Sequence, residues 1–406
     1  MNPRHALIIA GEASGDRLGA ELVCALSGAG DWRFWGAGGA CLAAAGVELA
    51  FDLTAHAVVG LWEVVKHYPE LRARFQRLLR LARDRQPDLV ILVDYPGFNL
   101  RFAAALKQAV RSRSGPFLNW RPRIAYFVSP QLWAWHGSRV RQIARDVDLM
   151  LCIFPFEPAW YAARAPDLAV QFVGHPLVDR YGSASKAPGA SGARPAPAGA
   201  GARTRPDPSA GHAVERVLML PGSREREIDR HLPVLLPAAA RLSARASIEL
   251  EMVLPNERLA EMARARTPPG LRIRILTGGL ESALARADIA IASSGTVTME
   301  CAFFGVPAVV IYRTSASTYW LGKRFIRVPY LAMPNLLAGE RVYPELIQRA
   351  ATPEAIAREA GALLDDTSRR QAIRQRLAGV IEALGPPGAC QRAAQAIQSL
   401  FPGQAA

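Results

Sequence analysis

Short runs of β-branched and apolar residues alternate with longer helical patterns along nearly the whole chain, and this alternation constrains the fold most. It is typical of parallel sheets built from β-α-β units. In the first half, strands are expected near residues 5–10, 32–35, 88–93, 123–128, 148–153 and 170–173. In the second half they are expected near residues 216–220, 249–254, 272–276, 288–292 and 308–312. Each half is therefore predicted to be a doubly wound α/β sheet.

Residues 182–213 separate the two halves. They are rich in Ala, Gly, Pro and Ser and lack the large apolar residues that a folded core needs, which predicts a flexible linker or surface loop. A chain of 406 residues also exceeds the usual size of one core. We expect domains at 1–181 and 214–384 with a ligand cleft between them. Residues 385–406 include a helical pattern that, in such folds, often returns to the first domain.

The chain is basic, with 49 Lys and Arg against 35 Asp and Glu, a net charge of +14. This favours an anionic partner but does not choose among nucleic acid, a phosphorylated substrate and an acidic bilayer. High arginine content also follows from a GC-rich genome. The five scattered cysteines argue against a disulfide framework or zinc site and fit a reduced cytosolic compartment. Without a signal peptide or a spanning apolar run, any membrane contact is expected to be peripheral.

Residues 11–16, GEASGD, form a glycine turn between the first strand and a helix expected from about residue 17. Backbone N–H groups at such a turn favour an anion. Because Glu12 and Asp16 would repel a pyrophosphate, we expect Glu12, Ser14, Gly15 and Asp16 to shape a sugar or acceptor pocket. The alternative is a tight turn in which Ser14 or Asp16 caps the helix.

Asp94 follows the strand at 88–93, and Pro96 ends that strand, so Asp94 is expected at the sheet edge where ligands bind. A carboxylate there can take the proton from an attacking sugar hydroxyl, as an inverting single displacement requires. The alternative is a role in loop hydrogen bonding. Asn99 is placed to cap the next helix.

The loop at 128–136 contains Trp133 and Trp135 around a prolyl turn. Indole rings there suit a sugar or an acyl chain, or they are core residues under a loop. Arg139 and Arg141 are candidates for binding a phosphate. His175 either reaches the cleft or is a satisfied structural residue. The pocket candidates from these loops are Ser129, Gln131, Trp133 and His175.

The second half opens with a strand followed by Gly222, Ser223 and Arg224. Glycine allows close approach, and the guanidinium of Arg224 offers a planar fork to two phosphate oxygens. Arg224 is the strongest candidate for the diphosphate. The alternative is a pair with Glu225 or Glu227 at a solvated helix start.

Ser294, Gly295 and Thr296 are expected at a helix amino terminus, where backbone donors form an anion site. Glu300, about one turn further, can accept both hydroxyls of a ribose. Asn335, in the loop at 333–339, is expected to turn toward the same pocket. This order of residues suggests a nucleotide diphosphate bound without a metal.

Seven motifs occur together and in order: GEASGD, DYPGFN, VSPQLWAW, FVGHP, LPGSR, ASSGT with a following Glu, and MPNLLAG. With them the chain resembles the lipid-A-disaccharide synthase family over nearly its whole length. The resemblance implies two Rossmann-like domains of the GT-B type. It also implies transfer of 2,3-diacylglucosamine from UDP to the 6-hydroxyl of 2,3-diacylglucosamine 1-phosphate, giving a β(1→6) bond and UDP. No metal, other cofactor or nucleic acid is implied, and the oligomeric state is left open.

The resemblance also assigns roles to single residues. Asp94 is the implied base, Arg224 the diphosphate clamp, Glu300 the ribose contact and Asn335 a further donor-site residue. Gly97 stands where the family commonly has a second acid, so Asp94 alone can serve as base in that loop. Residues 182–213 look longer than the family needs.

From Leu61 to Arg85, apolar residues at helical spacing, interrupted at Pro69, are interleaved with arginines. This basic amphipathic element is expected to meet the anionic inner face of the cytoplasmic membrane of a Gram-negative bacterium. The alternative, for residues 71–82, is a crossover helix packed on the sheet. The four candidates for lipid contact are Trp62, Val64, Val65 and Tyr68. Two other functions remain open, a UDP-sugar isomerase on the same fold and a nonenzymatic nucleotide-dependent membrane adaptor.

Overall fold

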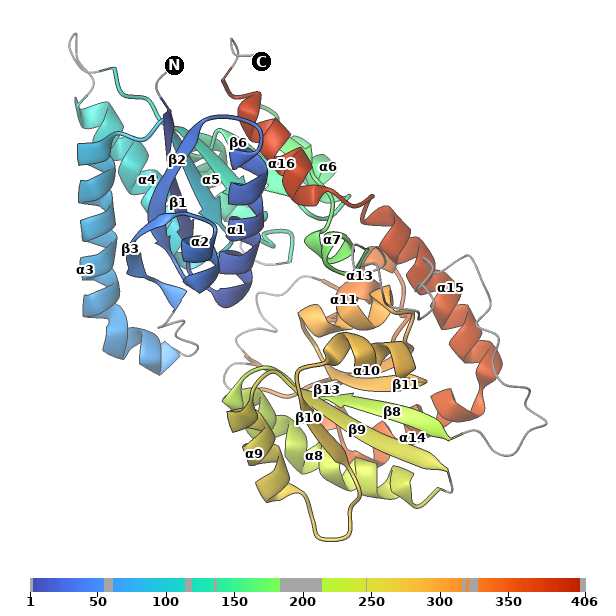
Figure 1. Cartoon of the computed structure of the whole chain (residues 1–406). Coiled ribbons are helices and arrows are strands. Elements are labelled where there is room, and N and C mark those ends of the chain that lie inside the picture. The colour runs from blue at the N-terminus through green and yellow to red at the C-terminus, as the bar shows by residue number, and fades with distance from the viewer. Residues whose placement is uncertain are drawn as a thin grey trace. The chain divides into compact units, whose positions relative to one another are not determined.

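The structure, a computed structural model, describes residues 3–54, 61–113, 119–134, 137–182, 214–245, 247–315, 319–320 and 328–401, without the side chains of 61–68 and 113. The chain divides into two compact units (Figure 1). Unit 1 comprises Met1–Gly182 and Leu384–Ala406, and unit 2 comprises Ser183–Ala383. The expected linker, from residue 183 on, lies outside the described residues, and the cleft expected between the domains stays a prediction.

Unit 1 contains a seven-stranded parallel sheet with the order β3-β2-β1-β4-β5-β6-β7. Its strands are β1 (Arg4–Ala10), β2 (Trp32–Gly38), β3 (Glu48–Asp52), β4 (Leu89–Val93), β5 (Arg123–Phe127), β6 (Leu149–Cys152) and β7 (Ala169–Phe172). All six strands expected from the sequence are confirmed. Strand β3 was missed because it lies at the sheet edge, where none of its residues is fully buried and the burial shows no clear alternation.

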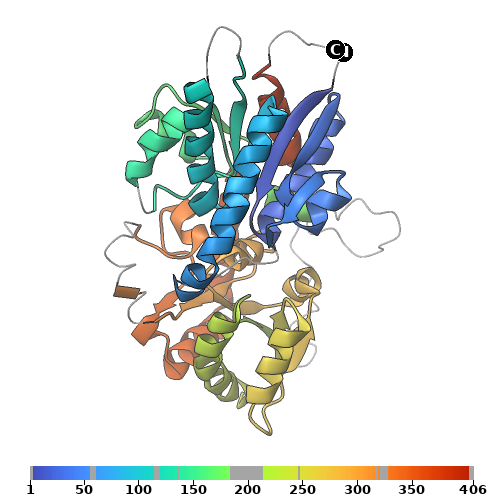
Figure 2. The same cartoon turned by 90° about the vertical axis from the view of Figure 1, so that its left-hand side faces the viewer.

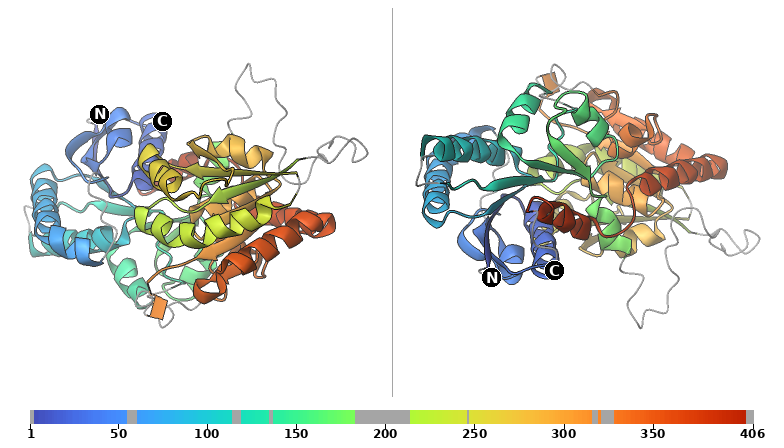
Figure 3. Two further views of the ribbon diagram at one scale, coloured as in Figure 1. Left: turned by 90° about the horizontal axis from the view of Figure 1, so that it is seen from below. Right: turned by 90° about the horizontal axis from the view of Figure 1, so that it is seen from above.

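Helices cover both faces of this sheet. They are α1 (Ala13–Ser27), α2 (Ala40–Ala44), α3 (Leu61–Arg85), α4 (Pro96–Arg113), α5 (Val140–Asp146), α6 (Glu157–Ala162), α7 (Pro176–Gly182) and α16 (Ala389–Gln398), with a 3₁₀ turn at Gly137–Arg139. Helices α3, α4 and α5 pack on one face, and α1, α2 and α16 lie together on the other (Figures 1 and 3). The strand order reverses between β1 and β4.

Helix α3 is continuous through Pro69 and runs along its face of the sheet (Figure 2). Leu78, Leu79 and Ala82 are buried in the core between α3, α4 and the sheet. Residues 71–82 therefore form the crossover helix that the sequence left as an alternative. The lipid-contact candidates at 62–68 lie outside the described side chains. Within the described part of the chain, no helix is both long and apolar enough to cross a membrane.

The carboxy-terminal segment belongs to unit 1 although unit 2 precedes it in sequence. The carboxylate of Asp179 on α7 accepts hydrogen bonds from the backbone N–H groups of Gly388 and Ala389, at the start of α16. Arg392 on α16 donates from Nε to the carbonyl oxygen of Val173 at 2.8 Å. These bonds fix α16 to the carboxyl end of β7, and its apolar side packs on α1.

Unit 2 contains a six-stranded parallel sheet with the order β10-β9-β8-β11-β12-β13. Its strands are β8 (Glu215–Leu220), β9 (Ile248–Leu254), β10 (Arg274–Thr277), β11 (Ile289–Ser293), β12 (Ala308–Tyr312) and β13 (Glu345–Ile347). The five expected strands are confirmed. Strand β13 was missed because it has three residues, too few for a periodic pattern. The order reverses between β8 and β11.

Helices cover both faces of this sheet as well. They are α8 (Glu225–Ser243), α9 (Glu257–Arg266), α10 (Leu280–Arg286), α11 (Thr296–Phe303), α13 (Met333–Ala338), α14 (Pro353–Asp365) and α15 (Thr367–Ala383), with a 3₁₀ turn at Gln348–Ala350. Helices α8, α9 and α14 lie on one face, and α10, α11, α13 and α15 on the other (Figure 1).

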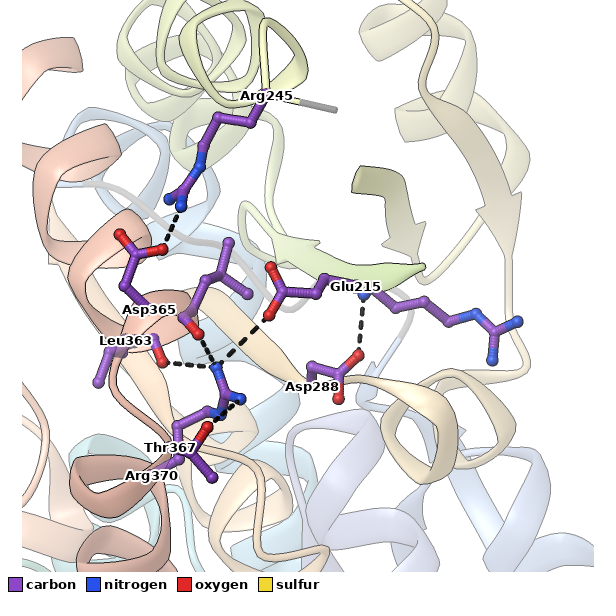
Figure 4. A network of polar contacts seen from close by, with 9 residues as sticks. Glu215, Arg245, Asp288, Leu363, Asp365, Thr367 and Arg370 are labelled. Atoms are coloured by element: carbon purple, nitrogen blue, oxygen red, sulfur yellow. Dashed lines mark hydrogen bonds and ion pairs between the residues drawn. The ribbon is translucent and has the colours of Figure 1, made fainter. Parts of the chain in front are cut away.

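A buried arginine joins α14, α15 and β8 (Figure 4). Arg370, 2% exposed, donates to the carbonyl oxygens of Leu363 and Leu364 at the end of α14 and lies 3.6 Å from the carboxylate of Glu215. It thereby satisfies helix carbonyls that have no partner within α14. Burial raises the pKa of Glu215, and the positive charge of Arg370 opposes that shift.

We expect Arg370→Met to destabilise unit 2 by about 2–3 kcal/mol, because buried carbonyls and a partly buried carboxylate lose a charged donor. The measurement is the urea midpoint, with hydrogen exchange across α14 and α15 to assign the loss to unit 2. Arg369→Met, at a neighbouring partly exposed position whose side chain lies 3.6 Å from the carboxylate of Glu359, is the matched control. Equal midpoints for the two variants would show that the network does not stabilise the unit.

Candidate active site

The candidate residues of each unit lie where the strand order of its sheet reverses. Open parallel sheets bind ligands at the carboxyl ends of the two strands that flank this point. In unit 1 these strands are β1 and β4, paired through Ala10 and Val93, and they lead to Glu12 and Asp94. In unit 2 they are β8 and β11, and they lead to residues 222–224 and 294–296. The sheet topology therefore brings Glu12 and Asp94 to the same edge of the unit 1 sheet. It brings residues 222–224 and 294–296 to the same edge of the unit 2 sheet.

Asp94 lies in a backbone corner that side chains rarely adopt. Its φ is +46° and that of Tyr95 is +48°, both in the left-handed region. The carbonyl oxygen of Asp94 accepts hydrogen bonds from Tyr126 Oη at 2.6 Å and from Asn99 Nδ2 at 2.7 Å. Such strain persists where surrounding groups hold it, and it is concentrated at functional sites.

The same corner explains the first glycine of GEASGD. A Cβ on Gly11 would collide with the ring of Tyr95, so the β1 and β4 loops can approach only if residue 11 is glycine. Asn99 was expected to cap the next helix, but α4 begins at Pro96, so this expectation was wrong. Asn99 lies inside the first turn of α4. Its side-chain amide donates to the carbonyl oxygen of Asp94 and so stabilises the backbone at Asp94 and Tyr95.

The carboxylate of Asp94 is electrostatically unusual. Burial, reinforced by the nearby negative charge of Glu12, raises its pKa from 3.8 to about 6. A base with a pKa near the working pH is both largely deprotonated and able to hold a proton. The arrangement suits proton abstraction from a bound hydroxyl.

The carboxylate of Asp16 forms hydrogen bonds within the fold. Its buried carboxylate accepts hydrogen bonds from the backbone N–H groups of Gly39, Cys41 and Leu42 at 2.6, 2.9 and 3.3 Å. It therefore caps α2, a helix distant in sequence, whereas α1 starts at Ala13, earlier than expected. The expected capping of its own helix is therefore wrong, whereas the expected role of Asp16 in shaping a sugar or acceptor pocket stays a prediction.

The other members of that motif differ in accessibility. Gly15 is buried against Val93, whereas Ser14 is exposed and Glu12 is partly exposed. Glu12 and Ser14 are thus the two residues of the motif that a ligand at the β1 and β4 ends can reach.

The loop after β5 is joined to the start of α6. Ser129, 4% exposed, lies 3.1 Å from Tyr161 through their hydroxyl oxygens, and Trp133 Nε1 donates to Glu157 Oε1 at 3.2 Å. Gln131 is exposed. Glu157 was missed, although it lies in Phe-Pro-Phe-Glu between the end of β6 and the start of α6, on the same side of the sheet as Asp94. Trp135 lies outside the described residues.

His175 is a structural residue, as one of its two readings expected. Its Nδ1 accepts the backbone N–H of Leu177 at 3.1 Å, at the start of α7, and its side chain is buried. Burial, reinforced by the positive charge of Arg180, lowers the pKa of His175 to about 4. The ring is therefore neutral at physiological pH.

In unit 2, Arg224 precedes the first turn of α8 with a half-exposed side chain. Its guanidinium is 3.8 Å from Glu227, the pairing that the sequence left as an alternative. Glu227 Oε2 accepts the N–H of Ser223 at 2.8 Å and fills the space that a Cβ on Gly222 would need, where φ is +130°. Because exposed ion pairs are weak, the guanidinium can exchange Glu227 for a phosphate.

His231, also missed by the sequence reading, supports this loop. Its Nδ1 donates to the carbonyl oxygen of Pro221 at 2.6 Å, and its Nε2 accepts the N–H of Arg313 at 3.0 Å. These two bonds require the neutral Nδ1–H tautomer. The side chain is fully buried on α8 and ties the β8 loop to the loop after β12.

The loop after β11 opens α11. Gly295 has φ +154° and ψ −165°, a conformation available almost only to glycine, and a Cβ there would meet open space. Thr296 is exposed, and Ser294 donates from Oγ to the carbonyl oxygen of Leu331 at 3.2 Å. Glu300, 9% exposed, lies one turn along α11 as expected. The helix amino terminus is accessible to an anion.

Asn335 forms hydrogen bonds within its own loop. It is fully buried, donates from Nδ2 to Tyr343 O and Glu345 Oε1 at 2.9 Å each, and accepts Tyr343 N–H at 2.7 Å. Glu345, not singled out from the sequence, also accepts the backbone N–H of Leu331 and Ala332. Asn335 thus holds its own loop together in this structure, and its expected role in donor binding stays a prediction.

Across the residues described here, no group of three or more His, Cys, Asp or Glu side chains is arranged to hold a metal ion.

We expect Asp94→Asn to stabilise the folded protein above pH 6. Because the folded pKa of Asp94 lies above the unfolded value, wild-type stability falls as pH rises from about 4 through 6, by about 3 kcal/mol in all. Asparagine is isosteric, tolerates positive φ and does not titrate. Calorimetric melting from pH 4 to 8 should show a gap between variant and wild type that grows with pH. Asp84→Asn, on an exposed helix position, should show no such gap.

Comparison with known proteins shows the family of the chain. A family model described as lipid-A-disaccharide synthetase matches residues 6–400. The lipid-A-disaccharide synthase of Syntrophus aciditrophicus (strain SB) is 39% identical over 401 residues, 97% of each chain. That of Myxococcus xanthus (strain DK1622) is 39% identical over 404 residues, 99% of this chain and 98% of the relative.

Solved structures share the fold at low identity. UDP-GlcNAc 2-epimerase from Neisseria meningitidis bound to UDP-GlcNAc matches with a TM-score of 0.61 at 10% identity, over 98% of this chain and 100% of the other. CalG4, the calicheamicin glycosyltransferase, matches with a TM-score of 0.58 at 15% identity, over 99% and 100%. The two parallel sheets are thus Rossmann-like domains of the GT-B type. With its family match over nearly the full length, the chain belongs to the lipid-A-disaccharide synthase family.

Proposed function

We propose that this glycosyltransferase of lipid A biosynthesis transfers 2,3-diacylglucosamine from UDP to the 6-hydroxyl of 2,3-diacylglucosamine 1-phosphate. The products are the β(1→6)-linked disaccharide 1-phosphate and UDP. Family membership supports the reaction class. The observation that carries the chemistry is Asp94, a carboxylate with a pKa raised to about 6 at the carboxyl end of β4.

In the proposed step, Asp94 takes the proton of the acceptor 6-hydroxyl. The hydroxyl oxygen bonds to C1 of the donor sugar as the bond from C1 to the diphosphate oxygen breaks, which inverts the configuration at C1. Glu12 assists indirectly, because its negative charge raises the proton affinity of Asp94. Tyr126 and Asn99 keep the carboxylate in place through the carbonyl oxygen of the same residue.

Unit 2 supplies the proposed donor site. Arg224 and the amino terminus of α11 stabilise the negative charge that grows on the departing UDP. Glu300 accepts hydrogen bonds from the ribose hydroxyls. Accessible residues at the β8 and β11 ends support this role, namely Arg224, Gly295 and Thr296.

We also propose peripheral contact with an anionic inner-membrane surface, where the acylated substrates are located. Support comes from Arg72, Arg77 and Arg80, which are exposed on α3 while its apolar side packs on the sheet. Each such cation near an anionic leaflet contributes about 1 kcal/mol.

Incubation of purified protein with UDP-diacylglucosamine and the acylated sugar phosphate separates the candidate functions. Disaccharide plus UDP supports transfer. An epimerised sugar nucleotide would instead support the isomerase, and unchanged substrates the adaptor.

Asp94→Asn should abolish disaccharide formation and leave UDP affinity within about threefold, because the amide cannot accept the proton and unit 2 is unchanged. In the wild type, kcat should rise with pH through about 6 as Asp94 loses its proton. Turnover and calorimetric UDP titration are the measurements. Near-normal turnover by the variant would remove Asp94 as the base.

Arg224→Met should weaken UDP binding about 10- to 100-fold, since it removes a charge-assisted pair of hydrogen bonds to phosphate. Arg226→Met, two residues further and also exposed, is the control and should bind UDP as the wild type does. Similar affinities for the two variants would place the diphosphate elsewhere.

A further inference from the structure

Three aromatic side chains form a cluster on the carboxyl edge of the unit 1 sheet. The Trp133 ring meets Phe156 at 5.1 Å and Phe154 at 6.3 Å, both edge to face, and Phe154 stacks on Phe156 at 6.0 Å. Trp133 and Phe156 are partly exposed, whereas Phe154 is buried beneath them. We call Trp133, Phe154 and Phe156 the aromatic platform.

Glu157 fixes this platform from below. Its fully buried carboxylate accepts Trp133 Nε1–H through Oε1 at 3.2 Å and the backbone N–H of Phe154 through Oε2 at 3.0 Å. One side chain thus ties the loop after β5 to the loop after β6. Burying a carboxylate costs free energy, and these hydrogen bonds offset part of that cost.

The hydrogen bond to Glu157 decides what Trp133 can offer a ligand. Indole has a single donor, and Glu157 takes it. The exposed part of Trp133 is therefore an apolar ring surface, next to the partly exposed ring of Phe156. Such a surface matches the C–H face of a pyranose.

The platform also lies on the same sheet edge as the proposed base. Strand β5 pairs with β4 through Phe127 and Val93, and β6 pairs with β5 through Leu151 and Phe127. Neighbouring strands are about 4.8 Å apart, so the loops after β5 and β6 begin about 5–10 Å from the Asp94 strand. That spacing is comparable to one sugar ring.

We propose that Trp133 and Phe156 bind the apolar face of the acceptor glucosamine ring, and that Glu157 is the positioning residue that holds Trp133 for this contact. The inference rests on the transferase function proposed above and adds a sugar-binding surface and its anchor.

The charge state of Glu157 can be changed by pH, and this allows its role to be tested. Burial raises the pKa of Glu157 to about 7, with the hydrogen bonds from Phe154, Ser129 and Trp133 opposing the shift. The other titratable groups described around it are Cys152, Tyr161 and His175. Burial raises the pKa of the thiol and of the phenol, and lowers that of His175 to about 4. Between pH 5.5 and 8.5, Glu157 is the member of this described group that changes charge.

The first test is tryptophan emission of the full-length protein from pH 5.5 to 8.5. Subtracting the spectrum of Trp133→Phe from the wild-type spectrum isolates Trp133, because phenylalanine keeps an aromatic ring at this position but lacks the indole that emits and its N–H donor. The difference should titrate near pH 7 in the wild-type background and stay flat in the Glu157→Gln background. A titration that persists with Glu157→Gln overturns the anchoring role.

The second test is steady-state kinetics with the acceptor varied. Glu157→Gln should raise the acceptor KM about tenfold, as expected for a lost hydrogen bond to a charged group, with kcat and donor KM within about threefold. Trp133→Phe should do the same, and the double variant should be no worse than either single variant, because both remove one interaction. In the wild type, acceptor KM should fall as pH rises through 7. Additive effects, or an equal rise in donor KM, overturn the proposal.

Controls separate this inference from simpler explanations. Asp146→Asn removes another buried carboxylate of unit 1, one paired with Arg145, and should leave acceptor KM unchanged. Acceptors with short and long acyl chains should suffer equally from Trp133→Phe; a penalty that grows with chain length would show that the platform binds lipid instead.

If Glu157→Gln fails to fold by circular dichroism, Trp133→Phe alone carries both tests. A wild-type protein that binds UDP but forms no disaccharide overturns the proposed function itself.

Discussion

The corner that places Asp94 depends on hydrogen bonds to one carbonyl oxygen. Tyr126 from β5 and Asn99 from α4 both donate to Asp94 O, and they hold two successive residues at positive φ. Gly11 at the end of β1 leaves room for the ring of Tyr95. The position of this carboxylate at the reversal point of the sheet thus depends on three neighbouring elements rather than on its own loop.

The two units use the same topology for different chemistry. In each, the strand order reverses beside the first strand, and both flanking loops carry glycines and polar residues. The unit 1 edge is acidic and aromatic, with Glu12, Asp94 and Trp133, which suits a sugar hydroxyl. The unit 2 edge presents Arg224 and the open amino terminus of α11, which suits a diphosphate. The proposed difference in function between the units therefore lies in the loops, while the topology of the two sheets is alike.

Carboxylates in unit 1 have opposite effects on the stability of the fold. Asp16 is surrounded by three backbone donors and stabilises a helix start, whereas Asp94 and Glu157 have raised pKa values that weaken the fold at neutral pH. Along one sheet edge, Asp16 therefore stabilises the fold, whereas Asp94 and Glu157 have raised pKa values.

The sequence by itself determined both parallel sheets, the position of Asp94 at a strand end and the glycine loops of unit 2, because these follow from local periodicity and strand termination. It missed the edge strands β3 and β13, whose few half-buried residues carry no period. Only the tertiary structure decided that Asp16 caps α2, that the Asn335 amide is satisfied within its own loop and that Glu157 anchors Trp133. Each of these depends on hydrogen bonds between segments 8 to 26 residues apart. Sequence pattern gives the residue type at a sheet edge, but the partners that satisfy or expose it are set by how the loops pack.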